Sequence, residues 1–267
     1  MKAFRTFKAL FAAFLLAAAP LGPVHASSIT LLGVGHAAAA GSTVTTINAT
    51  GAGSQSFGAG TLDIEVWGAG GSAGTNGVSI IWSNGAGAYS KVTLTLATTT
   101  TVFYYNGVPG TTTPNTAGQD TWANSVSNAA PTLTTQGALA KGGQAGTSSA
   151  AGLGGAAASG VGTTKFSGGN GALLNAGAGP NTPPNYSFPG GAGAGGPTGN
   201  GTNAGYPTGG AGNSPGGNGG NGEVLNGSFG TVSAPTSSTA PGASGSVGGN
   251  NPSPPGAAGQ IVFTFTP

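Results

Sequence analysis

The stretch GGAGAGGPTGNGTNAG, residues 190–205, contains almost no side chain large enough to bury. It is typical of the chain, in which 56 of the 267 residues are Gly and 18 are Pro. Such a composition points either to low-complexity disorder or to a structure in which glycine is a building material. Disordered chains usually carry high net charge, whereas only 4% of these residues are charged. The composition therefore weighs against simple disorder.

Many glycines around this stretch recur in steps of three residues. The phased runs are Gly143, Gly146, Gly152 and Gly155; Gly162, Gly168, Gly171 and Gly177; Gly190, Gly193, Gly196, Gly199 and Gly205; Gly216, Gly219 and Gly222; and Gly242, Gly245 and Gly248. Three residues make one turn of a polyproline-II-type helix, and Gly at every third place lets neighbouring helices approach closely enough for backbone hydrogen bonds. The pattern predicts a compact bundle of short polyglycine-II helices, with a flexible tract as the alternative.

Strand patterns flank the glycine-rich half. In TLDIEVW, residues 61–67, apolar Leu62, Ile64 and Val66 alternate with their neighbours, which is the period of a half-buried strand. The segments 88–107 and 259–267 repeat this alternation and are rich in Thr and aromatic residues, which suit strands. The Gly- and Asn-rich stretches between them, such as 67–77, are interpreted as turns.

These patterns predict an all-β fold with an insertion. Residues 43–136 are expected to form a β-sandwich-like base, and the strand at 259–267, with Ile261, Phe263 and Phe265 on one face, is expected to close its sheet. The glycine-rich region, residues 137–258, then lies between strands of the base.

The beginning of the chain is typical of a secretory signal. A basic segment, MKAFRTFK, precedes the apolar run ALFAAFLLAAA, and VHA ends at Ala26 with the small residues of a cleavage site. An apolar run of this length is too short to cross about 30 Å of hydrocarbon. We therefore predict a signal peptide at residues 1–26, a flexible segment at 27–42, and a location outside a bacterial cell, at its surface or in the periplasm, with no stable membrane insertion after cleavage.

The charges exclude one class of partner. After residue 26 the chain carries three Lys and four acidic residues, a net charge of −1. Binding to nucleic acid needs clustered Lys and Arg, so a nucleic-acid partner is excluded. The chain has no Cys, which rules out disulfides and thiolate metal sites.

Catalytic residue types are scarce, and we predict no enzymatic activity, no cofactor and no metal site. His25 lies in the predicted signal peptide and His36 in the N-terminal segment, so neither is a credible base. Asp63 and Glu65 share one strand face and could form an acid/base or Ca²⁺ pair, with Asp120 as a further ligand. Because Ca²⁺ takes six or more oxygen ligands, the pair is interpreted instead as part of a solvated outer face.

The remaining charges and aromatic residues divide by region. Glu223 and Lys141 are isolated in the glycine-rich half and are interpreted as solvated. Aromatic residues between the phased glycine runs are candidate binding residues, because rigid aromatic side chains make good recognition anchors. These candidates are Tyr186, Phe188, Tyr206 and Phe229. Packing within the base or on its sheets is expected for the aromatic residues Trp67, Trp82, Tyr104 and Trp122.

The order of several motifs resembles a known family. The motifs are LDIEVWGAGGSAG (62–74), GAGAYSKVTLTL (85–96), GQDTWAN (118–124), ALAKGGQAG (138–146) and KFSGGNGA (165–172). From about residue 43 to the end, the chain resembles the glycine-rich domain family of phage tail-fibre and adhesin proteins and of bacterial surface proteins. The resemblance implies a β-sandwich-like base carrying polyglycine-II helices whose loops contact a receptor. Phage adhesins are assembled in the cytoplasm, so the signal peptide favours a secreted or surface protein of a bacterium.

Two functions remain open at the level of sequence. The first is an exported, non-enzymatic recognition or adhesion protein that presents glycine-rich loops to a cell-surface glycan or an outer-membrane protein. The alternative is a structural matrix or coat protein that self-associates through its glycine-rich faces, or organises water as ice binders do, without a specific receptor.

Overall fold

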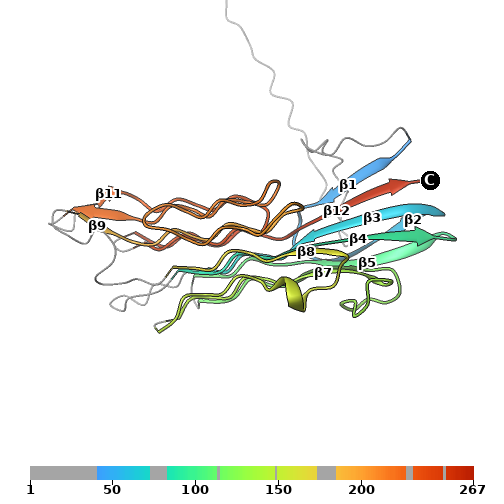
Figure 1. The fold of residues 1–267 in the computed structure, drawn as a ribbon, viewed down its shortest axis with the longest axis horizontal. Coiled ribbons are helices and arrows are strands. Elements are labelled where there is room, and N and C mark those ends of the chain that lie inside the picture. Colours follow the sequence, from blue (N-terminus) through green and yellow to red (C-terminus); the bar gives the residue numbers. More distant parts are fainter. Residues whose placement is uncertain are drawn as a thin grey trace, which may run out of the picture.

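A computed structural model describes residues 41–72, 83–112, 115–147, 149–172, 185–226, 231–248 and 251–267. The predicted signal peptide and most of the N-terminal segment therefore lie outside the described residues. The described chain is nearly all β, and its one helical element is a 3₁₀ turn, η1 (Ala157–Ser159). In Figure 1 the longer strands gather at one end of the molecule and the glycine-rich segments extend from them toward the other.

One sheet of five antiparallel strands follows the order β1-β12-β3-β4-β8. Its strands are β1 (Thr43–Ile47), β12 (Gln260–Thr266), β3 (Gly60–Trp67), β4 (Tyr89–Leu96) and β8 (Thr164–Phe166). The C-terminal strand β12 pairs with both β1 and β3, so the end of the chain completes the sheet that its first half begins, as the sequence predicted.

A second antiparallel sheet follows the order β2-β5-β6-β7. Its strands are β2 (Gly51–Phe57), β5 (Thr100–Asn106), β6 (Thr121–Asn124) and β7 (Gly137–Ala140). We call these two sheets together the base. Strands β7 and β8 come from the region that the sequence assigned to the glycine-rich half, so the base draws on more of the chain than residues 43–136.

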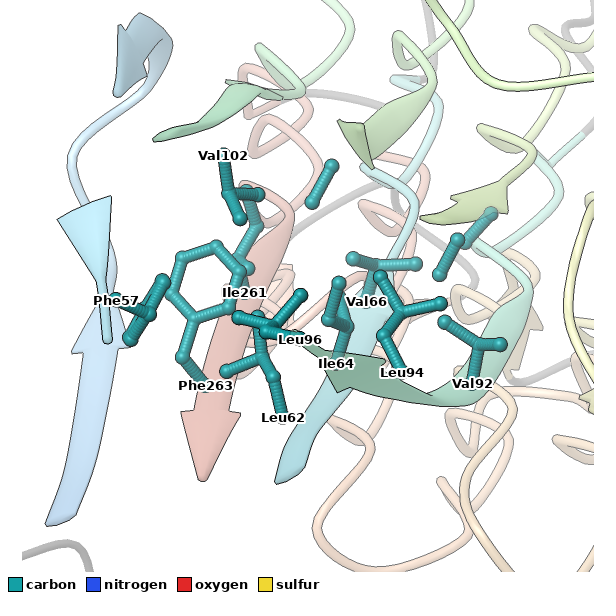
Figure 2. Packing of buried hydrophobic residues seen from close by; sticks show 13 residues of the cluster. Phe57, Leu62, Ile64, Val66, Val92, Leu94, Leu96, Val102, Ile261 and Phe263 are labelled. Carbon is teal, nitrogen blue, oxygen red and sulfur yellow. The ribbon is translucent and has the colours of Figure 1, made fainter. Parts of the chain in front are cut away.

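The core of the base lies between the two sheets (Figure 2). The alternation in β3 has the predicted effect, because Leu62, Ile64 and Val66 are fully buried. The rings of Phe57 and Phe263 pack with centroids 5.2 Å apart. The cluster of buried residues contains Phe57, Leu62, Ile64, Val66, Val92, Leu94, Leu96, Val102, Ala123, Ala138, Ala140, Ile261 and Phe263. Two apolar sheet faces packed in this way stabilise the base through the burial of apolar surface.

A second cluster lies where the five-stranded sheet meets the glycine-rich segments. Trp67 and Tyr89, which pair across β3 and β4, are fully buried, with ring centroids 5.0 Å apart. Tyr104 packs against the core of the base. The expectation that Trp67 and Tyr104 pack within the base is confirmed, whereas Trp82 lies outside the described residues.

The quoted stretch forms a hairpin whose two arms bond through their backbones. The N–H groups of Gly190, Gly193 and Gly196 donate to the carbonyls of Gly205, Thr202 and Gly199, each with an N···O distance of 3.0 Å. The residues between them donate to other segments. The N–H of Gly191 donates to the carbonyl of Gly220, that of Ala194 to Gly217, and that of Gly195 to Gly87. Ala192 donates to the side-chain oxygen of Ser244. Successive N–H groups of residues 190–196 therefore point to different neighbours, and two of the three series, 190/193/196 and 191/194, return to the same neighbour every third residue.

The same period of three appears in a segment interpreted from the sequence as a turn. Within residues 68–72, Gly68 and Gly71 donate to residues 88 and 85, whereas Ala69 and Ser72 donate to residues 119 and 116. Residues 68–72 are thus an extended segment surrounded by others, and the turn interpretation is wrong for them. The first half of the chain contributes to the glycine-rich packing as well as to the base.

Glycine is required in these segments because no side chain fits. A Cβ atom added at Gly87 would lie 1.8 Å from the carbonyl oxygen of Gly68, and one added at Gly193 would lie 2.0 Å from that of Ala211. At Gly196 the oxygen of Asn213 would be 1.9 Å away. Close-packed protein interiors leave no room for such overlaps, so even one methyl group must push two backbones apart.

We predict that Gly193→Ala destabilises the fold by at least about 2 kcal/mol, because the added methyl group meets backbone that cannot rotate away. Gly58→Ala is the matched control: a Cβ there would have its nearest neighbour, a ring carbon of Phe265, at 3.8 Å. That exposed position should change stability by no more than about 0.5 kcal/mol. Thermal and chemical unfolding would measure both, and equal stability of the two variants would contradict the steric explanation.

Candidate functional site

A small third sheet lies at the end of the glycine-rich region that faces away from the base (Figure 1). Its strands β9 (Asn185–Ser187), β10 (Val224–Asn226) and β11 (Thr231–Ser233) are antiparallel, in the order β11-β10-β9. We call it the distal sheet. In Figure 1 the C-terminus and β1 lie at the opposite end of the molecule. Both ends of the described chain therefore belong to the base.

Three of the four predicted binding residues have described positions near this sheet. Tyr186 lies in β9 and pairs with Leu225 of β10. Phe188, half-buried, follows β9, and its N–H donates to the carbonyl of Glu223 at 2.8 Å. Tyr206 is also half-buried, and the carbonyl of the next residue, Pro207, accepts from the N–H of Gly222 at 2.7 Å. Phe229 lies outside the described residues.

Glu223, which directly precedes β10, differs from the prediction made from the sequence. It was interpreted as solvated, yet its side chain is fully buried. Its carboxylate accepts hydrogen bonds from Thr231 Oγ1 at 3.0 Å and from Asn251, through the backbone N at 3.1 Å and Nδ2 at 2.7 Å. Burying a carboxylate is costly unless it is hydrogen-bonded, so these donors are what makes its position tolerable.

The Glu223 network joins separate parts of the chain at the distal sheet. The side chain connects β10 to β11 and to Asn251, while its backbone N–H donates to Val247 at 3.1 Å. A glycine tract offers few side chains to hold strands together. One buried carboxylate with several donors therefore holds the strands of the distal sheet together. Tyr186 and Phe188 lie in and next to the strand β9 of that sheet. A single Glu between Gly222 and Val224 gives no sequence signal of this role.

We predict that Glu223→Gln loosens the distal sheet without unfolding the base. The amide keeps the size of the side chain but loses the charge and one acceptor, which leaves a buried donor unsatisfied at a cost of about 1–3 kcal/mol. Hydrogen exchange should become faster in β9 and β10 and stay unchanged in β3 and β4. Asp120→Asn, at a half-exposed carboxylate of the base, is the control and should leave the distal sheet protected.

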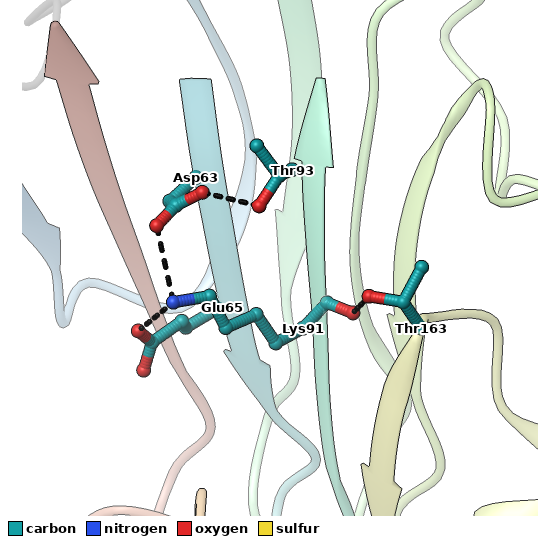
Figure 3. A network of polar contacts seen from close by, with 5 residues as sticks. All are labelled: Asp63, Glu65, Lys91, Thr93 and Thr163. Carbon is teal, nitrogen blue, oxygen red and sulfur yellow. Dashed lines mark hydrogen bonds and ion pairs between the residues drawn. The ribbon is translucent and has the colours of Figure 1, made fainter. Parts of the chain in front are cut away.

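The acidic pair of β3 forms a different kind of cluster (Figure 3). Lys91 Nζ lies 3.1 Å from Asp63 Oδ2 and 3.3 Å from Glu65 Oε1, so one ammonium group bridges both carboxylates. Thr93 donates to Asp63 Oδ1 at 2.5 Å, and Thr163 Oγ1 donates to the Lys91 carbonyl at 3.2 Å. Glu65 is only 6% exposed. The prediction of a solvated face is therefore wrong for Glu65, and an ammonium group occupies the position between the carboxylates.

Asp120, considered from the sequence as a further calcium ligand, does not lie with this pair. Its carboxylate forms an ion pair with Lys141 Nζ and accepts from the N–H of Gly142 at 2.9 Å. Lys141 is thus paired, not isolated as the sequence suggested. Among the described residues, no group of three or more His, Cys, Asp and Glu side chains lies close enough to hold a metal ion.

Burial and charge shift two pKa values beside the acidic pair. Burial raises the pKa of Tyr89 well above its ordinary value of 10.0, and the negative charge of Glu65 raises it further. Partial burial lowers the pKa of Lys91, but its hydrogen bonds and ion pairs with Asp63 and Glu65 outweigh this effect and leave the pKa raised. The fold therefore favours a neutral Tyr89 and a charged Lys91.

This arrangement predicts a loss of stability in alkali. A group whose pKa is raised on folding contributes its full stability below the pKa of the unfolded chain and loses it as the pH rises toward the folded value. For Tyr89 and Lys91 that loss begins near about pH 10. Tyr89→Phe keeps the ring but removes the ionisable group. Its melting temperature should fall less steeply than that of the natural protein above about pH 10, with parallel curves below pH 9.

A scan against known protein families finds no family model that matches the chain, and a search of curated proteins finds no match either. The resemblance to glycine-rich adhesin domains therefore rests on the motifs of the sequence. Within the described ranges, no helix has the length and apolar composition needed to cross a membrane.

Proposed function

We propose that the chain is an exported, non-enzymatic recognition or adhesion protein that presents the distal sheet and its loops to a cell-surface glycan or protein. The observation that carries this proposal is the position of the distal sheet. It lies at the far end of the glycine-rich segments from the base, to which both ends of the described chain belong (Figure 1). A recognition surface held at a distance from the base suits contact with another cell.

The glycine-rich segments are, in this proposal, a bundle of short polyglycine-II helices. The support is the hydrogen-bond period of three in residues 68–72 and 190–196, since a polyproline-II-type helix has three residues per turn. The close approach of carbonyl oxygens to the glycine Cα positions supports it too. Such a bundle is a stiff spacer without a large apolar core, because backbone hydrogen bonds join each segment to several others.

The sequence supports two further parts of the proposal, that the chain is exported and that its partner is not a nucleic acid. Residues 1–26 have the composition of a signal peptide, and the mature charge of −1 disfavours nucleic acid. Aromatic side chains at Tyr186 and Tyr206 would supply the contacts with the receptor, since aromatic anchors dominate many interfaces. The distal sheet and the Glu223 network would hold them in place before binding, which reduces the entropy lost on association.

The test is binding of the purified chain to bacterial cells. We expect saturable binding that falls at least about tenfold in a Tyr186→Ala/Tyr206→Ala double variant, because truncating an anchoring aromatic residue costs about 2 kcal/mol or more. Val126→Ala is the control, since Val126 is 66% exposed and lies in the loop after β6. Hydrogen exchange of the distal sheet would verify that the double variant remains folded.

The structural alternative makes the opposite prediction in the same samples. A matrix or coat protein would assemble further as its concentration rises, which sedimentation velocity would detect, and would bind no cell saturably. The recognition proposal would therefore be overturned if the chain assembled with rising concentration and the Tyr186→Ala/Tyr206→Ala variant bound cells as strongly as the natural protein.

A further inference from the structure

We propose that the outward face of the four-stranded sheet contains a second binding site, for an uncharged sugar ring, centred on Tyr105 and Trp122. The alternation of the strands sets the direction of these side chains. In β6, Ala123 belongs to the core, so its neighbour Trp122 faces the other side of the sheet. In β5, Tyr104 packs against the core, so Tyr105 likewise faces outward.

The two rings are stacked beside each other on this outward surface. Tyr105 and Trp122 are paired across β5 and β6, and their rings are nearly parallel, at 20°, with centroids 6.4 Å apart. Both side chains are half-buried, so each keeps part of its ring in contact with solvent. Half-buried Leu139, the partner of Trp122 on β7, extends the same row.

Polar groups border this surface on the side toward the glycine-rich segments. The Tyr105 hydroxyl donates to Gln119 Oε1 at 2.5 Å, which fixes the side-chain amide of exposed Gln119 beside the ring. Asp120, two residues before Trp122 and therefore on the same face, forms its ion pair with Lys141. Their side chains are 37% and 35% exposed, so both can still donate to or accept from a ligand.

This combination matches the chemistry of a sugar. The C–H groups of a pyranose ring carry slight positive charge and pack against the negative face of an aromatic ring. The hydroxyl groups at the edge of the sugar need donors and acceptors in fixed positions, which Gln119, Asp120 and Lys141 provide. Because the carboxylate and the ammonium group neutralise each other, the site favours a neutral ligand over a phosphate or a cation. It lies on the base, away from the distal sheet, and thus goes beyond the proposed function.

The experiment measures binding of oligosaccharides, four to six units long, of neutral hexoses and N-acetylhexosamines to the full chain by calorimetry and Trp fluorescence. We expect at least one of them to bind saturably, and Trp122→Ala to weaken its binding at least tenfold. Trp122→Phe, which keeps an aromatic face, should retain more of the affinity than Trp122→Ala. Gln119→Ala changes an exposed side chain and should weaken binding even if Trp122→Ala proves unstable.

The Tyr186→Ala/Tyr206→Ala variant separates this site from the proposed receptor site. If the inference is right, that variant binds the oligosaccharide as the natural protein does. Loss of binding in the distal variant with full binding in Trp122→Ala and Gln119→Ala would assign the sugar to the distal sheet and overturn the inference. Absence of saturable binding by every oligosaccharide would overturn it as well.

Discussion

The constraint on which the structure depends is the close approach of backbones in the glycine-rich segments. Carbonyl oxygens of neighbouring segments lie where the first atom of a side chain would be, at Gly87 and Gly193 for example. Ordering glycine is entropically the most expensive choice among the residues, and these segments have few large side chains to offset that cost. Hydrogen bonds between segments and close contacts between backbones are the available compensation. Each bond contributes on the order of 1 kcal/mol, so a glycine-rich segment becomes ordered only when many such bonds form together.

The base supplies what such segments lack. Its two sheets enclose an ordinary apolar core. Strands β3 and β7 continue directly into glycine-rich segments, and another such segment leads directly into β4. Trp67, fully buried at the last position of β3, is followed immediately by Gly68, whose N–H already bonds to another segment. The core thus fixes the starting points and register of several segments at once, which lowers the entropy lost when they associate. At the other end, Glu223 and its donors perform the comparable task with hydrogen bonds.

The sequence predicted what depends on periodicity. Apolar residues alternate clearly in β3, β4 and β12, and these strands form where the alternation predicts them. Strand β2, GAGSQSF, escaped notice because Gly and Ser give no alternation. Its Gly53 instead leaves space for the ring of Tyr104. The burial of Glu223 and the bridging of Asp63 and Glu65 by Lys91 could not be predicted, because each depends on residues far apart in the sequence that only the fold brings together.

The period of three also restricts how the length of this protein can change. In an ordinary surface loop, one inserted residue lengthens the chain and leaves the rest in place. Within residues 190–196, one inserted residue would shift each following residue into the place of its neighbour. Its N–H would then face a different segment, and side chains such as Ala192 would come to positions where only hydrogen fits. A change of three residues made in both paired arms, as in the hairpin of residues 190–205, would keep the alternation of partners seen at Gly190, Gly193 and Gly196. Changes of length in such a segment are therefore expected in steps of three residues, together with its paired segment.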